Sequence, residues 1–248
     1  MCGRYATSRT PADLDAAFGA RLADSAAALE ADYNVAPTKT APLVVGRGGK
    51  EAPLERELLA ATWGLVPSWA KDRSIGSRLI NARSETVAEK PAFRRAFASR
   101  RGIVPADGFY EWYAGPEHEP KQPKQPFFIT SPDRSVLGLA GLYEFWRPAP
   151  EEDWLVTFTI LTTSAEDTEG RLHDRAPLLV DPDARDAWLT PAPRDGTELW
   201  DMLTPATPGT LVAYPVSRAV NNVRNNGPEL VEPLPLEPPE AAILPMPG

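Results

Sequence analysis

Short runs of alternating hydrophobic and polar residues, rich in β-branched and aromatic side chains, recur along the chain and predict many β-strands. Two of these runs come early in the chain, and most of the others follow residue 101. The predicted strands cover residues 41–46, 58–65, 102–106, 109–113, 126–130, 136–145, 154–163 and 210–215. The segment 33–38 is predicted to be a loop, and the polar, proline-rich segment 115–125 is predicted to close a hairpin.

Helices are predicted in four segments. Thr10 precedes Pro11 and Asp13, a pattern typical of a helix N-terminus, and this helix is expected to run to about residue 30. Ser84 is expected to cap a second helix through roughly residue 101, which Pro91 must interrupt or restart. Two short helices are expected at 182–189 and 197–203. The mixture predicts an α+β fold with a mainly antiparallel sheet or barrel and flanking helices.

The pattern continues without an internal repeat or a linker up to residue 228, which predicts a single domain over residues 2–233. Prolines make up seven of the 21 residues from Pro228 onward. Proline fixes its own backbone and lacks an amide donor, so residues 234–248 are predicted to form an extended or disordered tail.

The composition restricts the class of protein. The chain has 248 residues, of which 42% are hydrophobic and 24% charged, ordinary values for a soluble globular protein. No run approaches the roughly 20 apolar residues of a membrane span, and the N-terminus lacks the apolar core of a secretory signal, so a cytoplasmic protein without a membrane partner is expected. One cysteine and two histidines exclude an internal disulfide and a cysteine–histidine zinc site. No metal and no other cofactor is expected.

Charge is distributed unevenly along the chain. The formal net charge of −8 argues against nucleic-acid binding, because phosphate binding requires positive charge. Residues 63–101, however, contain nine basic and three acidic side chains, whereas residues 131–248 contain 8 basic and 19 acidic ones. Charge alone leaves two interpretations open, a local nucleic-acid-binding patch or the solvated face of a helix.

Cys2 is the most distinctive candidate for chemistry. Removal of Met1 would expose an N-terminal cysteine, which carries a free α-amine and a thiol on adjacent carbons. The α-amine has a reference pKa of about 7.7–8.0, so a useful neutral fraction exists at pH 7. A neutral amine attacks an aldehyde to give a Schiff base, and the thiol then closes a five-membered thiazolidine. The alternative is an incidental cysteine near the terminus.

Two further side chains are candidates for proton transfer. His173 lies in a polar turn ahead of an apolar run, and histidine has the side chain whose unperturbed pKa is nearest neutrality. Glu111 lies in an aromatic strand whose alternation puts Phe109, Glu111 and Tyr113 on one face. If that face is enclosed, desolvation raises the pKa of Glu111 toward a general acid or base role. If it faces solvent, Glu111 is an ordinary surface residue.

Residues suited to DNA occur within the basic segment. Asn81 and Arg83 precede the second predicted helix, where an arginine is able to bind phosphate in a bidentate manner. Trp69 ends the sequence WGLVPSW, where an exposed indole can stack on a base. Tryptophan is more often a core residue, so that interpretation stays open as well.

Taken together, these segments resemble the SRAP family, the SOS-response-associated peptidases or abasic-site processing proteins. Eight motifs occur in the family's order and are spread over nearly the whole length of the predicted domain. They are MCGRY at residues 1–5, YNVAP at 33–37, WGLVPSW at 63–69, INARSET at 80–86, ADGFYEW at 106–112, QPFFI at 125–129, HDRAP at 173–177 and PVSRAV at 215–220. Each motif is weak alone, but eight in register argue strongly against coincidence.

The resemblance implies a covalent shield for abasic sites in single-stranded DNA during the SOS response to DNA damage. Proteins of this family link the ring-opened sugar aldehyde of the lesion to their N-terminal cysteine as a thiazolidine. The same Schiff-base step accounts for a strand-cleaving lyase activity, and the peptidase of the family name is best understood as self-removal of Met1. The implied form is a monomer in the cytoplasm that joins the nucleoid when it is bound to damaged DNA.

The resemblance also implies roles for individual residues. Cys2 would be the nucleophile, Glu111 would handle protons at its amine, and His173 would assist ring opening and Schiff-base chemistry. Asn81 would orient the sugar or the cysteine. The DNA-binding residues that the resemblance implies are Arg4, Asn34, Pro37, Trp69, Arg83 and Ser217.

One position departs from the pattern of the family. Some members carry two adjacent tryptophans, whereas Trp69 is followed here by Ala70. This difference concerns how strongly the protein separates the strands around the lesion, and not the crosslinking chemistry.

Two functions of other classes remain as alternatives. Glutamine amidotransferases with an N-terminal nucleophile also begin with Met-Cys-Gly, and there the thiol attacks an amide carbonyl while the α-amine acts as the base. This sequence lacks a recognisable second domain to receive the ammonia. The other alternative is a non-catalytic single-strand DNA module that uses the basic segment 63–101.

Overall fold

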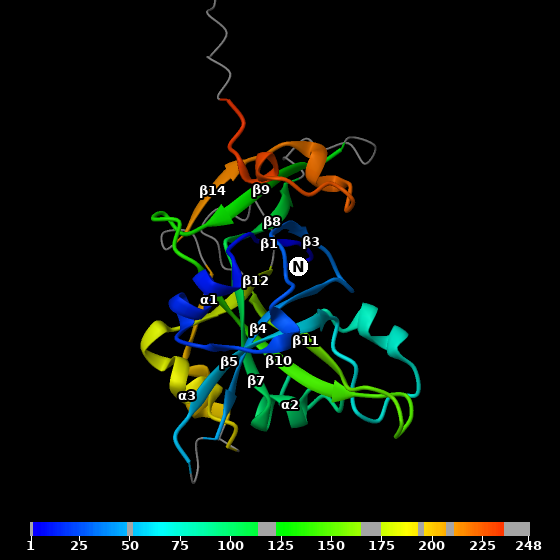
Figure 1. Cartoon of the computed structure of the whole chain (residues 1–248). Coiled ribbons are helices and arrows are strands. Elements are labelled where there is room, and N and C mark those ends of the chain that lie inside the picture. Colours follow the sequence, from blue (N-terminus) through cyan, green and yellow to red (C-terminus); the bar gives the residue numbers. More distant parts are fainter. Residues whose placement is uncertain are drawn as a thin grey trace, which may run out of the picture.

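Two β-sheets and a few short helices form the protein in a computed structural model (Figure 1). The structure describes residues 2–48, 52–113, 123–164, 175–192, 196–206 and 211–235. This architecture is the α+β fold with a mainly antiparallel sheet core that the strand pattern predicts.

The larger sheet closes on itself as a barrel. Each strand of the ring pairs with two others in the order β10, β7, β4, β5, β11 and back to β10, and only the β5–β11 pairing is parallel. The outlying strand β6 adds to β11 in parallel, β12 pairs with both β10 and β11, β13 extends β12, and the short β2 pairs with β5. The bounds are β2 Arg21–Leu22, β4 Thr40–Arg47, β5 Glu55–Trp63, β6 Asn81–Arg83, β7 Arg101–Ala106, β10 Leu137–Trp146, β11 Leu155–Ser164, β12 Arg175–Val180 and β13 Leu203–Pro205.

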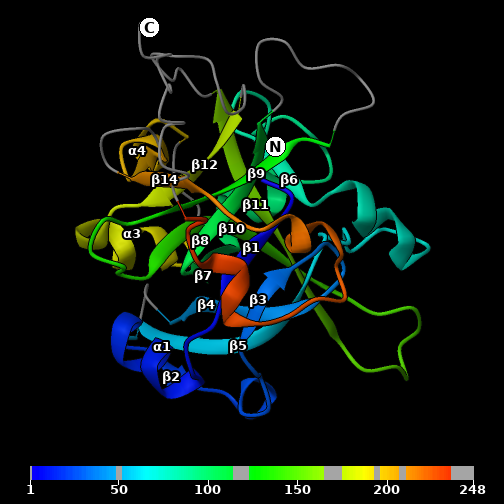
Figure 2. The ribbon, with the colours of Figure 1, turned by 90° about the horizontal axis from the view of Figure 1, so that it is seen from above.

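The smaller sheet lies beside one end of the barrel (Figures 1 and 2). Its strand order is β14, β9, β8, β1, β3, and its pairings are all antiparallel. The bounds are β1 Tyr5–Thr7, β3 Asp32–Val35, β8 Gly108–Tyr113, β9 Gln125–Thr130 and β14 Val212–Pro215. The chain therefore joins its first residues to strands that lie a hundred residues later.

The alternation of side chains along the strands divides the core into three clusters. In β4, Val44 packs with the helices outside the barrel, whereas Leu43 and Val45 belong to the cluster inside it. The interior cluster continues to Cys2, Tyr5 and Phe109, so these residues close the end of the barrel. The opposite face of the smaller sheet packs against the C-terminal segment in a third cluster of Ala6, Tyr110, Phe128, Val216, Val220 and Leu230.

The first helix is shorter than predicted. Helix α1 spans Pro11–Phe18 and begins with the expected capping box, in which Thr10 and Asp13 bond each other's backbone amides. It ends because Gly19 adopts a left-handed conformation with φ of 57°. The next residues form β2 against β5 and then a 3-10 helix at Asp24–Ala26, so the prediction of a helix to residue 30 is wrong.

The second predicted helix is also mostly absent. Residues 81–83 form β6, residues 84–93 form turns, and helix α2 covers only Arg94–Ser99. Pro91 lacks an amide donor, which favours the turn that precedes α2. The short helices near 182–189 and 197–203 are present as α3 (Arg185–Leu189), which follows a 3-10 turn at Pro182–Ala184, and α4 (Gly196–Trp200). In the described ranges, no helix is long and apolar enough to cross a membrane.

One loop prediction also needs correction. The segment predicted as a loop at 33–38 contains β3 at Asp32–Val35. The proline-rich segment after Gly227 begins with a 3-10 helix at Pro228–Val231, in which Leu230 is fully buried. Most of the predicted hairpin loop and residues 236–248 lie outside the described residues.

Arg101 changes the interpretation of the basic segment. Its side chain is only 2% exposed and donates to the carbonyls of Phe97, Ala98, Trp188, Thr190 and Ala192. These carbonyls lie at the ends of α2 and α3, where helices have unsatisfied acceptors. One of the nine basic residues therefore stabilises the fold and is not available to bind DNA.

Candidate active site

Cys2 lies at the closed end of the barrel, just before β1. The pairing of Tyr5 with Phe109 brings the start of the chain beside β8, and the Tyr110 amide donates to the Arg4 carbonyl over 2.9 Å. Cys2 is fully buried and packs in the interior cluster with Tyr5 and Phe109. A residue at the very start of the sequence is therefore held as firmly as the core.

The surroundings of Cys2 favour the protonated thiol. Burial raises the pKa of the Cys2 thiol above its ordinary value, and the nearby negative charge of Glu111 raises it further. The positive charge of the chain terminus and, after it, the backbone amide of Arg4 act in the opposite direction and lower this pKa. Burial and Glu111 thus favour the protonated thiol over a preformed thiolate.

Glu111 occupies the enclosed face of its strand. The alternation predicted from the sequence is confirmed, because Phe109 belongs to the barrel cluster while Tyr110 belongs to the cluster on the other face. Glu111 itself is 4% exposed. Of the two situations that the pattern left open, the structure has the enclosed one.

Asn81 is the second polar group at Cys2. Strand β6 is positioned by its parallel pairing with β11, in which Ile160 lies opposite Asn81, and by a 2.9 Å hydrogen bond from the Trp63 indole to the Ile80 carbonyl. The Asn81 amide nitrogen donates to the Cys2 carbonyl over 2.8 Å. Its amide oxygen is buried and has no hydrogen-bond partner among the described residues. Asn81 therefore fixes the backbone of Cys2 and keeps one acceptor available.

Tyr5 is a neighbour of Cys2 that the sequence analysis did not single out. Its ring packs edge-on against Trp63 with centroids 5.2 Å apart, and burial raises the pKa of its phenol well above the ordinary value. The phenol oxygen is buried without a hydrogen-bond partner in the described ranges. Its place in the MCGRY motif is the one signal that links it to the site.

Two of the predicted DNA-binding side chains are exposed. Arg83 ends β6, two residues after Asn81, and its side chain reaches solvent. Trp69 lies in the turn after Pro67 and is 56% exposed, so the interpretation of this tryptophan as a core residue is wrong. Both side chains are therefore accessible from solvent.

His173 lies outside the described residues, but the start of the strand that follows it is well defined. Arg175 begins β12 opposite Ser164 of β11 and donates to both carboxylate oxygens of Glu85, each over 3.0 Å. The hydrogen bonds from Arg175 lower the pKa of Glu85 to about 2. This ion pair joins the end of the INARSET motif to the HDRAP motif.

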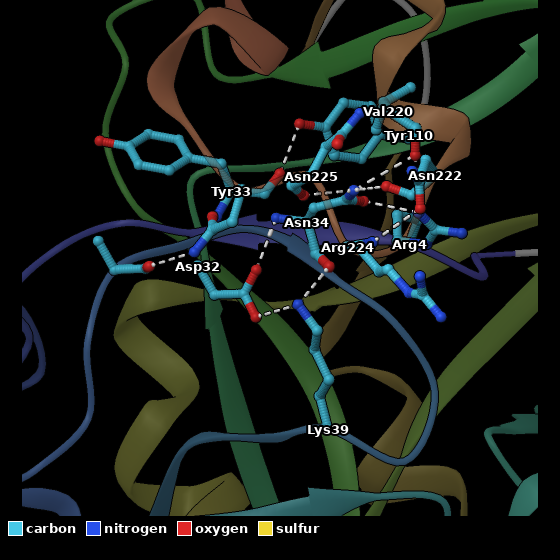
Figure 3. Close-up of polar contacts among 12 residues, drawn as sticks. Arg4, Asp32, Tyr33, Asn34, Lys39, Tyr110, Val220, Asn222, Arg224 and Asn225 are labelled. Carbon is cyan, nitrogen blue, oxygen red and sulfur yellow. Dashed lines mark hydrogen bonds and ion pairs between the residues drawn. The ribbon is translucent and has the colours of Figure 1, made fainter.

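Asn34 is the centre of a polar network under the C-terminal segment (Figure 3). Its side chain is fully buried, and its amide nitrogen lies 2.9–3.3 Å from the carbonyl oxygens of Val220, Asn222 and Asn225. Its amide oxygen accepts a 2.6 Å hydrogen bond from Arg4. Every polar atom of the Asn34 side chain is thus engaged within the protein, which leaves none to contact DNA directly.

Arg4 connects this network to the N-terminal strand. The same guanidinium nitrogen that binds Asn34 also donates to the Val220 carbonyl over 2.9 Å, and the guanidinium lies 5.7 Å from the centre of the Trp112 ring. Lys39 bonds Asp32 and the Asn34 carbonyl from below (Figure 3). The predicted phosphate ligand Arg4 is therefore partly committed to holding the C-terminal segment.

Pro37 and Ser217 occupy turns at the edges of the site. Pro37 is half-buried in the turn between β3 and β4, where the Thr38 amide donates to the Trp63 carbonyl. Ser217 is half-buried and caps a 3-10 helix at Arg218–Asn221 by accepting a hydrogen bond from the Ala219 amide. Both positions have structural roles, and their contact with DNA stays a prediction.

Comparisons with known proteins match nearly the whole chain. A family model described as SOS response associated peptidase (SRAP) matches residues 1–223. The chain is 37% identical to the abasic site processing protein YoqW of Bacillus subtilis (strain 168), over 94% of this chain and 99% of that protein. It is 32% identical to the abasic site processing protein YedK of Escherichia coli (strain K12), over 94% and 100%. It is 31% identical to the abasic site processing protein HMCES of Gallus gallus, over 84% and 68%.

Solved structures share the fold. A crystal structure of a protein from Bacteroides thetaiotaomicron covers 94% of this chain and all of its own, with a TM-score of 0.78 at 24% identity. Another, from Bordetella bronchiseptica, covers 87% of this chain and all of its own, with a TM-score of 0.69 at 27% identity. The first of these likenesses shows the fold alone.

The Asn34 network generates a prediction for stability. Asn34→Asp keeps the size of the side chain and the acceptor for Arg4, but turns a carboxylate oxygen toward three carbonyl oxygens. We expect the free energy of unfolding to fall by about 2–4 kcal/mol, and proteases to cleave the segment 218–226 faster. Chemical denaturation and limited proteolysis measure the two effects. The matched control is Asn222→Asp, at an exposed position whose side-chain oxygen accepts from the Arg224 amide, a contact that aspartate keeps. An equal loss in both variants would contradict the network.

The charge of Glu111 generates a prediction for pH dependence. Because that charge raises the pKa of Cys2, Glu111→Gln should lower it, so the rate of Cys2 alkylation should rise at a lower pH than in the wild type. Cys2 is the only cysteine, so intact mass reports its alkylation directly. Glu144→Gln, which changes a buried carboxylate elsewhere, is the control. An unchanged pH profile in Glu111→Gln would show that the two groups do not interact.

Proposed function

This chain belongs to the SRAP family, and on that premise we propose that it captures abasic sites in single-stranded DNA through a covalent bond to Cys2. The relatives named as abasic site processing proteins support the substrate. The observation that carries the proposal is the arrangement at the barrel end, where the carbonyl of Cys2 is bonded to Asn81 and its thiol interacts with the charge of Glu111.

The first step is release of the α-amine. An amide nitrogen does not form an imine, so Met1 must leave before Cys2 reacts, and we propose that the protein removes Met1 itself. This self-processing would account for the peptidase in the description of the family. A buried carboxylate such as Glu111 is a suitable base for a water or thiol that attacks the Met1 carbonyl.

The second step joins the amine to the lesion. The ring-opened sugar of an abasic site presents an aldehyde, and attack by the neutral amine gives a carbinolamine that loses one water to become an imine. Glu111 transfers protons during this attack and the loss of water. The neutral thiol then adds across the imine, with sulfur bonding to carbon and its proton going to nitrogen, and closes the thiazolidine. Burial keeps the thiol protonated, which suits an addition that consumes that proton.

Asn81 and His173 complete the proposed chemistry. The free amide oxygen of Asn81 accepts a hydrogen bond from the new α-amine or from a sugar hydroxyl, while its nitrogen keeps the Cys2 backbone fixed. His173 assists opening of the sugar ring as an acid and base near neutral pH. The Glu85–Arg175 ion pair holds the strand that follows His173. An imine that is not trapped by the thiol acidifies the adjacent carbon, which permits β-elimination and a lyase activity.

DNA binding is proposed for the exposed groups around this centre. Arg83 contacts a phosphate next to the lesion, and Trp69 stacks near the unpaired sugar. Arg4, Pro37 and Ser217 contact the DNA strand. Asn34 acts indirectly, because it holds Arg4 and the C-terminal segment in position. The acidic residues after residue 130 would face away from the strand.

The role of the thiol is tested by Cys2→Ala. Wild-type protein should form an adduct with abasic single-stranded DNA that survives denaturation without a reductant. Cys2→Ala keeps the α-amine after Met1 removal but has no thiol, so its adduct should survive only after borohydride reduction. Denaturing gels measure both. A stable unreduced adduct in Cys2→Ala would contradict the thiazolidine, and release of ammonia from glutamine by the wild type would favour the amidotransferase alternative.

The role of Arg83 is tested by Arg83→Ala. A phosphate ligand contributes through charge, so binding should weaken about three- to tenfold on damaged and undamaged single strands alike, and the salt dependence should become shallower by about 0.7 in log–log slope. Fluorescence anisotropy over a series of salt concentrations measures both. Arg21→Ala removes an exposed arginine of β2, on another side of the molecule (Figure 2), and is the control. An effect confined to abasic DNA would contradict a phosphate role.

A further inference from the structure

A cleft lined by three arginines lies between α2, the connection of β10 to β11, and the turn that carries Trp69. Its volume is about 460 Å³, and its lining includes Ser68, Arg95, Arg100, Arg147 and Trp154. Arg95 lies on α2 and Arg100 directly follows it, whereas Arg147 belongs to the β10–β11 connection, so the fold brings two distant parts of the sequence together. The basic residues of the segment 63–101 are visible in the sequence, but their proximity to Arg147 of the β10–β11 connection is not.

The positive charge of this cleft is only partly neutralised. Arg100 donates to one oxygen of Glu144 over 2.8 Å, and the other oxygen accepts from the Phe145 amide over 3.1 Å. Glu144 is the one carboxylate in the lining, and each of its two oxygens already accepts one of these hydrogen bonds. Arg95 and Arg147 therefore leave the cleft with a net positive charge. The acidic residues 151–153 belong to the β10–β11 connection but do not line the cleft.

The arginines are presented for an anion. Arg147 lies 4.3 Å above the ring of Trp154 and donates to the Pro150 carbonyl, which fixes its guanidinium at the rim. Arg100 is held by Glu144, and its Nε is buried away from solvent. Arg95 is exposed on α2. A phosphate oxygen is able to accept hydrogen bonds from such groups in a charge-assisted manner.

The cleft is continuous with the turn that carries Trp69. Ser68 lines the cleft, and the Trp146 indole donates to the Ala70 carbonyl over 2.8 Å, so the turn is tied to the end of β10. Trp69 and Trp154 are 56% and 57% exposed. The cyan segment that follows β5 and the end of the β10–β11 hairpin project on the same side of the molecule in both views (Figures 1 and 2).

We propose that this cleft binds a backbone phosphate of DNA beyond Trp69, as an anchor separate from Arg83. The inference rests on the proposed function, because it requires DNA at the barrel end. Bidentate arginines beside exposed aromatic rings are the chemistry of nucleic-acid binding. The phosphate belongs either to the strand that carries the lesion or to a complementary strand that flanks it, and the experiment distinguishes the two.

The test compares two neighbouring arginines of α2. Arg94 and Arg95 have the same side chain, are both exposed and both lie in the first turn, but only Arg95 lines the cleft. The substrates are an abasic oligonucleotide with long single-stranded flanks, the same oligonucleotide with a complementary strand on either flank, and a short one with about two nucleotides on each side of the lesion. Affinity and its salt dependence are measured for each.

Arg95→Ala should weaken binding about three- to tenfold on a long substrate and reduce the log–log salt slope by about 0.7–0.9, whereas Arg94→Ala should not. Neither variant should change binding or crosslinking of the short substrate. Arg95→Lys, which keeps the charge, should restore most of the salt slope. A loss on the single-stranded substrate assigns the phosphate to the lesion strand, and a loss only with a duplex flank assigns it to the complement.

Three results would overturn the proposal. One is an equal effect of Arg94→Ala and Arg95→Ala, which would indicate unspecific attraction. Another is an effect of Arg95→Ala that persists on the short substrate, and the third is no effect on any long substrate. Failure of the proposed function has a different signature, since the wild-type protein would then form no adduct even with the short substrate.

Discussion

The antiparallel pairing of β1 with β8 is the constraint on which the site depends. It joins the first residues of the chain to a strand a hundred residues later and buries Cys2 at the end of the barrel, beside the charge of Glu111. The pairing of β6 with β11 then brings Asn81 to the Cys2 carbonyl. A chain terminus normally frays, and a terminal amine that frays could not be aligned with a buried carboxylate. The barrel therefore holds the second residue of this protein in the fixed position that its proposed catalytic role requires.

Burial also determines the kind of chemistry that the site supports. Burial and the nearby carboxylate raise the pKa of the Cys2 thiol, which disfavours a preformed thiolate. The protonated thiol is suitable for a reaction in which the amine attacks first and the thiol adds afterwards together with its proton. These electrostatics agree with aldehyde capture that begins at the amine. Asn34 and Arg4 hold the C-terminal segment against the smaller sheet. This segment covers the face of the sheet that points away from the barrel.

Local patterns in the sequence predict the strands from Arg101 to Ser164 well, because alternation of buried and exposed residues is a property of each strand alone. They fail where a distant partner decides the structure. Residues 21–22 and 81–83 are strands because β5 and β11 pair with them, and neither partner is visible locally.

The candidate site is likewise only partly predictable from local sequence. Cys2, Asn81 and Glu111 are recognisable as reactive types, but their meeting depends on strand registers. Arg101 and Asn34 look like DNA ligands by type and are instead buried in contacts with backbone carbonyls that only the fold assembles.

The central claim is that the free amine and the thiol of Cys2 together capture an aldehyde on DNA. The most direct test is the intact mass of the purified protein before and after incubation with a single-stranded oligonucleotide that carries one abasic site. The account predicts a chain without Met1 that gains one oligonucleotide less one water and keeps it without a reductant. A chain that has lost Met1 and gains no oligonucleotide would contradict the account, and so would a stable adduct on a chain that still carries Met1.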